Sequence, residues 1–352
     1  MRVAQVTPAW LPVPAPGYGG IELLIASLTD ALVARGHEVT MFGTGDCVTR
    51  AKLRWLLEKA PGRSGLALLM NALEVDTRHA AMVLDEAAEF DIVHVHSPYG
   101  VLLSAALAGL PTVHTDHGWH DSHPLFRTVA ERVDFVAPSH AYLRELPALP
   151  YTHMVHHGID VERYPFRAVK DDYVVFIGRM VSAKGLHRAI GAAREAGLRL
   201  KAVGVSLGFD EEERYFTERI APLLADDVEL VRHEVGFDEK VELLSRARAM
   251  LFPIDWPEPF GLIVPEAMAC GTPVLASRCS ATPELIDDGR TGFIVDLAGY
   301  ESTGGRLLRE QISGLDPADC RRWVQQRFGI DRMVEGYERV YQAVLNRRKG
   351  FG

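Results

Sequence analysis

Two glutamates, Glu258 and Glu266, stand eight positions apart around the stretch PFGLIVP. The pattern predicts a helix over Leu262–Cys270, with a proline tolerated in its first turn and Gly271 ending it. One carboxylate then lies in the loop before the helix and the other on the helix itself. Between them, free amides at the helix N-terminus can bind an anion. This layout suits a ligand with hydroxyls at both ends and a diphosphate in the middle, as in a sugar nucleotide. In the alternative interpretation, both glutamates are solvated surface charges.

A second candidate is the loop GRMVSAKG, which directly follows the predicted strand DYVVFI. It places the cations Arg179 and Lys184 five residues apart beside a helix start, where they can neutralise a diphosphate. The spacing is not that of a P-loop. A third candidate is the glycine-rich loop Pro16–Gly20, which opens the first predicted helix without the dinucleotide fingerprint. A solvated basic loop and a plain strand-to-helix turn are the alternatives.

These loops need parallel strands to position them, and the chain alternates short apolar runs with helical patterns throughout. The alternation restarts after about His157–Ala168, which predicts two Rossmann-like doubly wound domains with a ligand site in the cleft between them. We expect domain boundaries at 1–160 and 161–329, with a C-terminal helix from Ile330 returning to the first domain. Other predicted helices include Glu211–Leu224 and Glu239–Ala249.

Length and composition agree with a two-domain α/β protein. The chain has 352 residues, and 47% of them are apolar. A chain of this length usually divides into two domains, each with its own hydrophobic core. A formal charge of −9 argues against a nucleic-acid binder. Four scattered cysteines without a Cys-x-x-Cys pair indicate a reducing, cytoplasmic location. The first residues show no signal peptide or membrane-spanning run.

Several motifs appear in one order along nearly the whole chain: GYGGIE, HTDHG, HHGID, GRMVSAKG, EPFGLIVPE, GTPV and DGRTGF. Together they resemble the retaining glycosyltransferases of family 4, which have the GT-B fold. The resemblance implies an enzyme that moves a sugar, a hexose in our prediction, from a nucleotide-diphosphate-sugar to a hydroxyl acceptor with retained configuration. It also implies that a cationic loop replaces the divalent metal of other glycosyltransferases; we expect no cofactor, and the chain has no Asp-x-Asp motif.

The resemblance assigns roles to individual residues. Glu266 would hold the ribose hydroxyls, Glu258 the donor-sugar hydroxyls, and His117 would contact the sugar near its anomeric carbon. The remaining donor-binding residues act on the diphosphate or, through the backbone of Val235, on the base: Gly19, Gly20, Arg179, Lys184, Val235, Phe260, Gly261 and Leu262. The N-terminal domain would bind the acceptor and the C-terminal domain the donor.

Eight histidines cluster in the first half of the chain and raise the hypothesis of a metal site: His94, His96, His114, His117, His120, His123, His156 and His157. No pair has the spacing of a known metal motif, so we interpret most of them as hydrogen-bonded residues at strand ends. Asp116 is unusual beside His117 and would orient it or touch the acceptor.

The acceptor stays open between a small molecule, a lipid and a glycan. The stretch Thr49–Met70 interleaves basic and apolar residues, typical of a helix on a membrane surface or of a helix packed on its own domain. A peripheral contact at the inner membrane surface is therefore an alternative to a purely cytoplasmic protein. The base of the donor is equally open, with a UDP-sugar favoured. The competing functions are a nucleotide-sugar epimerase of the same fold and a non-catalytic sugar-nucleotide-binding protein.

Overall fold

The computed structural model describes residues 1–17, 19–62, 66–97, 100–118 and 123–349, without the side chains of 66–73 and 123. The chain forms two compact units. Unit 1 consists of Met1–Gly158 and Ile330–Gly352, and unit 2 consists of Ile159–Gly329. The first and last residues of unit 2 are paired with each other. Ile159 and Gly329 form a parallel bridge, and the amide of Ile159 donates to Phe328 O at 2.9 Å.

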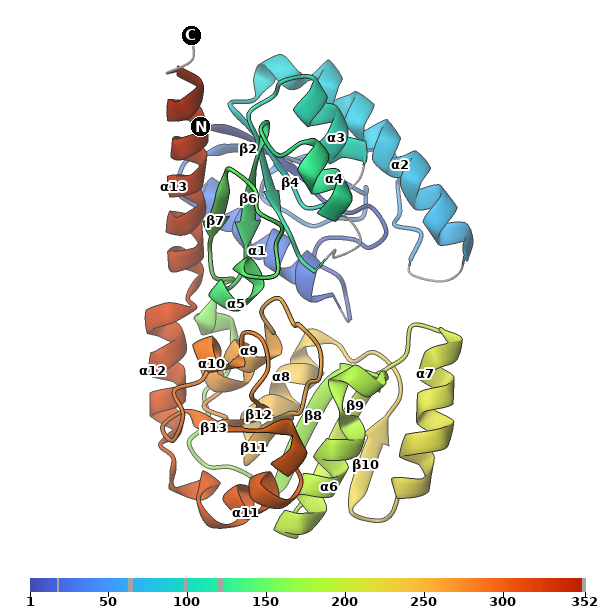
Figure 1. Cartoon of the computed structure of the whole chain (residues 1–352), viewed down its shortest axis with the longest axis vertical. Coiled ribbons are helices and arrows are strands. Elements are labelled where there is room, and N and C mark those ends of the chain that lie inside the picture. The colour runs from blue at the N-terminus through green and yellow to red at the C-terminus, as the bar shows by residue number, and fades with distance from the viewer. Residues whose placement is uncertain (18, 63–65, 98–99, 119–122, 350–352) are drawn as a thin grey trace. The chain divides into compact units, whose positions relative to one another are not determined.

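Unit 1 is built on a parallel sheet of seven strands in the order β3-β2-β1-β4-β5-β6-β7. The strands are β1 Arg2–Val6, β2 Glu38–Gly43, β3 Lys52–Trp55, β4 Ile92–Val95, β5 Thr112–Thr115, β6 Val133–Ala137 and β7 Thr152–Met154. Its helices are α1 Gly20–Ala34, α2 Leu66–Asp85, α3 Gly100–Leu107, α4 His123–Thr128, α5 His140–Leu143 and α13 Ile330–Lys349. Figure 1 shows α13 running alongside this sheet.

The strands of unit 1 present alternate residues to the two faces of the sheet. On β4, Val93 and Val95 pack in the core beneath α2 and α3, whereas His94 points to the face covered by α13 and bonds Tyr341. On β5, His114 lies against Phe126 of α4, and Thr115 bonds a tyrosine of α13. The α13 face therefore carries polar side chains, and the hydrogen bonds of His94 and Thr115 connect β4 and β5 to that helix.

Unit 2 repeats the architecture with six parallel strands in the order β10-β9-β8-β11-β12-β13. The strands are β8 Tyr173–Arg179, β9 Arg199–Val205, β10 Val228–Val231, β11 Ala249–Phe252, β12 Val274–Ser277 and β13 Gly292–Val295. Its helices are α6 Leu186–Ala196, α7 Asp210–Tyr215, α8 Phe237–Arg246, α9 Ile263–Ala269, α10 Thr282–Leu285, α11 Ser302–Glu310 and α12 Pro317–Arg327.

Both faces of the second sheet are buried. Val175 and Phe252 pack in a cluster with α8, α9 and α12, and Val174 and Phe176 pack in another with α6 and α11. Burial on both faces explains why these strands are almost wholly apolar. Strand order reverses between β8 and β11 here, and between β1 and β4 in unit 1. In open α/β sheets, ligands bind at the carboxyl ends of the strands beside such a point.

Three expectations about elements are wrong. The predicted helix Glu211–Leu224 is broken, because α7 ends at Tyr215 and a π turn and a 3₁₀ turn containing a proline follow. Helix α8 ends at Arg246, and Ala249 begins β11. Within Thr49–Met70, Lys52–Trp55 is an edge strand rather than part of a helix.

Candidate functional site

In unit 2 the loops that follow β8 and β11 are hydrogen-bonded to each other at the C-terminal ends of the strands. The amide of Asp255 donates to Ala183 O at 2.8 Å. Gly185 has φ +78°, and a Cβ there would lie 2.2 Å from Pro253 O. Only glycine therefore allows the two loops to approach this closely. The contact brings the predicted cationic loop against the segment that carries Glu258.

Lys184 and Glu258 form a direct ion pair across these two loops. The side chains are only 15% and 16% exposed. Trp256 completes the cluster: its Nε1–H donates to the same Glu258 Oε2 at 2.9 Å, and the Lys184 ammonium lies 4.6 Å from the centre of its ring. A half-buried lysine, a carboxylate and an indole thus occupy one place, where a ligand meets both signs of charge and an aromatic face.

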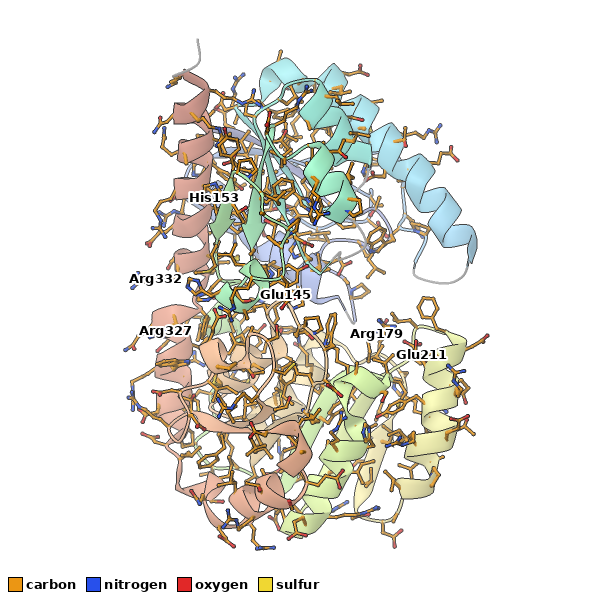
Figure 2. The ribbon with its side chains drawn as sticks, in the orientation of Figure 1. Glu145, His153, Arg179, Glu211, Arg327 and Arg332 are labelled. Atoms are coloured by element: carbon orange, nitrogen blue, oxygen red, sulfur yellow. The ribbon has the colours of Figure 1, made fainter. Side chains whose placement is uncertain are left out.

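Arg179, at the end of β8, is paired with a residue that the sequence interpretation did not identify. Its guanidinium donates from Nη2 to Glu212 Oε1 at 2.8 Å; Arg179 is labelled in Figure 2. Glu212 is 1% exposed and also accepts from the amide of Leu207 at 2.6 Å. Burial raises the pKa of this carboxyl, but the hydrogen bonds from Arg179 and from backbone amides outweigh it and hold the pKa below its ordinary value. Glu212 therefore fixes the guanidinium at the strand end.

Glu266 lies on α9 and is 3% exposed. Lys240 of α8 donates to both of its oxygens, at 2.7 and 2.8 Å. The hydroxyl of Tyr164 donates to Oε1 at 3.0 Å. Burial and the adjacent carboxylate raise the pKa of Tyr164 well above its ordinary value, so the hydroxyl keeps its proton and remains a donor. Glu266 is thus a preorganised buried carboxylate, not a solvated helix charge.

The other predicted residues of unit 2 surround the same edge. Phe260 is 2% exposed and packs edge-on against Phe328, so its side chain belongs to the core and only its backbone is available to a ligand. Gly261 has φ +92°, and Leu262 is the N-cap of α9. Val235 is 8% exposed and precedes α8, the helix that carries Lys240.

In unit 1, Gly19 is the N-cap of α1 and Gly20 is its first residue. A Cβ on Gly19 would lie 2.4 Å from Ala15 Cβ and 2.9 Å from Glu22 Oε2, so the loop closes tightly only with glycine. Glu22 is 1% exposed and lies in the first turn of the helix. Its carboxylate is attracted electrostatically to the N-terminal amides of α1, which are the same amides that the predicted diphosphate would bind. Tyr18 of this loop lies outside the described residues.

His117 follows β5 and is partly exposed. Its Nε2 lies 3.0 Å from Nδ1 of His96, which follows β4, and its ring lies 5.4 Å from that of His157. His96 Nε2 lies 2.8 Å from Gln5 Oε1 on β1. Burial lowers the pKa of His117 to about 3 and that of His96 well below its ordinary value, so both rings are neutral at pH 7.

Asp116 is fully buried beside this histidine. Its Oδ2 accepts from the hydroxyl of Tyr142 at 2.9 Å, and its Oδ1 accepts from the amide of Gly118 at 3.0 Å. A carboxylate without exposed surface cannot reach an acceptor in this conformation, so its observed part is to shape the turn after β5. His120 lies outside the described residues, as does the side chain of His123.

Among the residues that the structure describes, no group of three or more His, Cys, Asp or Glu is arranged to hold a metal ion. No described helix is long and apolar enough to cross a membrane. The cations expected on the face of a membrane-surface helix meet carboxylates instead: Arg54 Nε lies 2.9 Å from Glu86, and Lys52 Nζ lies 3.9 Å from Glu89. These contacts give no support to a membrane surface at this strand.

Sequence reasoning missed four residues of the unit 2 site, namely Tyr164, Glu212, Lys240 and Trp256. Glu212 had a usable signal, because it follows the loop after β9 and loops at strand ends carry function. Lys240 and Tyr164 had none, since each reaches Glu266 from a distant part of the chain. Chemically, the described part of unit 2 presents three cation–carboxylate pairs near one edge of the sheet: Arg179–Glu212, Lys184–Glu258 and Lys240–Glu266.

Two family models match adjoining parts of the chain. Residues 18–163 match the model described as Glycosyltransferase Family 4, and residues 162–302 match that described as Glycosyl transferases group 1. The chain is 26% identical to the D-inositol 3-phosphate glycosyltransferase of Acidothermus cellulolyticus, over 99% of this chain and 91% of that one. It is 27% identical to the alpha-maltose-1-phosphate synthase of Mycobacterium tuberculosis, over 76% and 81%.

Solved structures show the same fold. The sucrose-phosphate synthase of Thermosynechococcus elongatus matches with a TM-score of 0.79 at 20% identity, covering 98% of this chain and 99% of that one. AviGT4, a glycosyltransferase involved in avilamycin A biosynthesis, matches with 0.74 at 23% identity, covering 98% of both. HepE of Anabaena, solved in complex with UDP and glucose, matches with 0.75 at 18% identity, covering 97% and 100%.

Proposed function

Because the chain belongs to the family 4 glycosyltransferases with the GT-B fold, we propose that it transfers a hexose from a nucleotide-diphosphate-sugar to a hydroxyl acceptor, with retention and without a metal ion. The observation that carries the proposal is the set of charges at the carboxyl edge of unit 2. The Lys184–Glu258 and Lys240–Glu266 pairs and the buttressed Arg179 all lie on or beside loops that follow strands there.

The chemistry of these groups supports a donor site in unit 2. Glu266 is a buried acceptor for the two ribose hydroxyls, and the hydrogen bonds from Lys240 and Tyr164 fix its orientation. Arg179 and Lys184 neutralise the diphosphate, together with the amides at Phe260–Leu262 and at Gly19 and Gly20. Glu258 accepts from hydroxyls of the sugar, and the backbone of Val235 contacts the base. That HepE binds UDP and glucose supports a UDP-sugar as the first donor to try.

In the reaction, the bond between the anomeric carbon and the diphosphate oxygen breaks, and the electron pair leaves with the nucleotide diphosphate. Arg179 and Lys184 stabilise the charge that develops on that oxygen. The acceptor oxygen forms its bond to the anomeric carbon on the same face, and its proton passes to the departing phosphate oxygen. His117 contacts the sugar, and unit 1 supplies the acceptor pocket. The acceptor is a small molecule, a lipid or a glycan that presents a hydroxyl.

The test begins with a screen of UDP-, GDP- and ADP-sugars for a rise in melting temperature of the protein. The donor found is then incubated with panels of acceptors after exhaustive dialysis against EDTA. Retention predicts a product whose anomeric proton shows the same coupling as in the donor. An inverted product, or a turnover restored only by added divalent ion, contradicts the proposal. Conversion of the donor sugar without any acceptor would indicate the epimerase, and tight binding without turnover would indicate a non-catalytic binding protein.

A further inference from the structure

We propose that a buried hydrogen-bond relay from Tyr341 through Gln5 and His96 decides which nitrogen of His117 carries its proton, leaving Nδ1 to accept a hydrogen bond from a ligand hydroxyl. The relay is a property of unit 1 alone. The identity of the hydroxyl, on the donor sugar or on the acceptor, rests on the proposed function. His96 and Gln5 are thereby positioning residues for His117.

The relay starts at the amide of Gln5, which is completely buried on β1. Its Nε2 lies 3.3 Å from the hydroxyl oxygen of Tyr341 and 3.4 Å from His94 Nδ1. Because the Tyr341 hydroxyl oxygen accepts from Gln5, we assign its own proton to the same nitrogen of His94, which lies 2.7 Å away. His94 Nδ1 is therefore an acceptor, and its Nε2–H donates to Thr115 Oγ1 at 2.8 Å. In this orientation of the Gln5 amide, its N–H donates to the Tyr341 hydroxyl, and the proton of that hydroxyl is matched by the lone pair of His94 Nδ1.

The amide oxygen of Gln5 then faces His96. An amide oxygen can only accept, so His96 Nε2, at 2.8 Å, carries a proton and donates it. A neutral imidazole has one N–H, which leaves His96 Nδ1 bare. His117 Nε2 lies 3.0 Å from that bare nitrogen and must be the donor between them. His117 Nδ1 consequently carries no proton.

The rings stay in this state at neutral pH because none of them is charged. Burial lowers the pKa of His94 and of His96 well below the ordinary value, and neighbouring imidazoles lower both further. A second proton on His96 would set two N–H groups against each other across the 3.0 Å contact. The proton positions of the relay are therefore the same throughout the neutral pH range.

The consequence concerns what His117 can recognise. Its Nδ1 offers a lone pair, so the ligand must bring a hydrogen-bond donor, such as a sugar or acceptor hydroxyl. A fluorine in place of that hydroxyl accepts only, and both partners would then present lone pairs. His117 is also unable to give a proton to the departing oxygen through Nδ1, which agrees with a proton route through the phosphate.

The direct test is a two-bond ¹H–¹⁵N correlation spectrum of the unaltered protein with ¹⁵N-labelled histidine at pH 7.5. The chain has fourteen histidines, and the signals lost in His117→Ala assign the ring in question. The relay predicts a protonated Nε2 and a bare Nδ1 for His117. A protonated Nδ1 with a bare Nε2 would mean that the Gln5 amide is reversed, and would overturn the proposal.

His96→Phe removes the acceptor while keeping a ring of similar size in the core. It should turn the His117 spectrum into a mixture of both tautomers and lower kcat about three- to tenfold, the loss of one hydrogen bond. The donor KM should change less than about twofold, because the proposed contacts to the ribose and the base lie in unit 2. The matched control is His114→Phe, which is equally buried but points to the other face of the sheet and bonds Val95 O.

His114→Phe should leave the His117 tautomer and kcat unchanged. A single Nε2–H tautomer that persists in His96→Phe would overturn the relay. The unaltered protein keeps the test decisive if His96→Phe fails to fold. A bare Nδ1 in a protein that transfers no sugar supports the relay and contradicts the proposed function alone.

Discussion

Each candidate ligand-binding charge in unit 2 is already neutralised within the protein. Lys184 pairs with Glu258, Arg179 with Glu212, and Glu266 with Lys240. The pairs differ in how far the acidic partner is exposed to solvent. The side chain of Glu212 is completely buried and holds Arg179 in place, whereas the side chain of Glu258 is 16% exposed, about as much as that of Lys184. A diphosphate at Lys184 must therefore compete with Glu258, and a donor sugar that draws Glu258 away makes room for it.

The first prediction concerns Lys240. Lys240→Met leaves Glu266 buried with Tyr164 alone, and breaking a buried pair costs about 3 kcal/mol of folding stability. Because Glu266 loses the group that orients it, UDP affinity should fall roughly tenfold, equivalent to about 1.4 kcal/mol. Calorimetric titration with UDP and urea unfolding measure the two effects. The exposed neighbour on the same helix provides the control, Glu239→Gln, which should change neither.

An unchanged or tighter UDP affinity in a folded Lys240→Met protein would contradict this account. It would mean that Lys240 competes with the ribose for Glu266 instead of positioning the carboxylate.

Among the elements, α13 is fastened to unit 1 near its end by a buried ion pair. Asp134 on β6 is completely buried and accepts from Arg347 of α13 on both oxygens and from His153 of β7 at 2.8 Å. Burial raises the pKa of Asp134, but the hydrogen bonds from Arg347 and His153 outweigh it and keep the pKa below its ordinary value. Since that pKa is lower in the folded chain, its contribution to stability is present above about pH 4 and is lost as the pH falls further.

The second prediction follows from this clasp. Arg347→Met should lower the stability of unit 1 by about 3 kcal/mol at pH 7, because it leaves a buried carboxylate with one partner. The double variant Asp134→Asn with Arg347→Met should recover part of the loss. Hydrogen exchange of the backbone amides of β6 and α13 measures the change in stability of each variant. Equal losses in the single and the double variant would show that the helix contacts, and not the unpaired charge, carry the effect.

The alternation of strands and helices was predictable because both sheets are buried on two faces, which gives continuous apolar runs such as that of β8. Strand Lys52–Trp55 was not, because an edge strand with exposed cations has no such run. The end of α8 could not be predicted either, because the chain becomes extended at Ala247 without a glycine or a proline to mark the change. The motifs located candidate site residues near the ends of strands. Their partners, such as Lys240 and Tyr164 for Glu266, come from distant parts of the chain, so no local sequence pattern could predict them.

At the scale of the whole molecule, buried neutral histidines are concentrated in unit 1. Among the described residues of that unit, burial lowers the pKa of six imidazoles: to about 4 for His79 and His114, to about 3 for His117, and well below the ordinary value for His94, His96 and His157. Unit 2 has two histidines, and burial lowers the pKa of one of them, His187, to about 4. The units should therefore differ in their response to acid.

The third prediction is that unit 1 unfolds first as the pH falls. An imidazole whose folded pKa lies below 6.5 binds its proton more readily in the unfolded chain, so its contribution to stability is full above about pH 6.5 and is lost as the pH falls. Each such group costs about 1.4 kcal/mol per pH unit below that value. Hydrogen exchange corrected for the intrinsic rate should show unit 1 losing protection between pH 6.5 and 5 while unit 2 keeps it. Parallel losses in both units would contradict the prediction.

The central claim is that Glu266 holds the nucleotide and Glu258 the sugar, and calorimetric titration of both alanine variants with UDP tests it most directly. A hydrogen bond to a charged group contributes about 1.5–3 kcal/mol, so Glu266→Ala should weaken UDP roughly ten- to a hundredfold. Glu258→Ala removes the competitor of Lys184 and should leave UDP affinity unchanged or tighter, while single-turnover transfer slows. Loss of UDP affinity in Glu258→Ala with full affinity in Glu266→Ala would contradict the account.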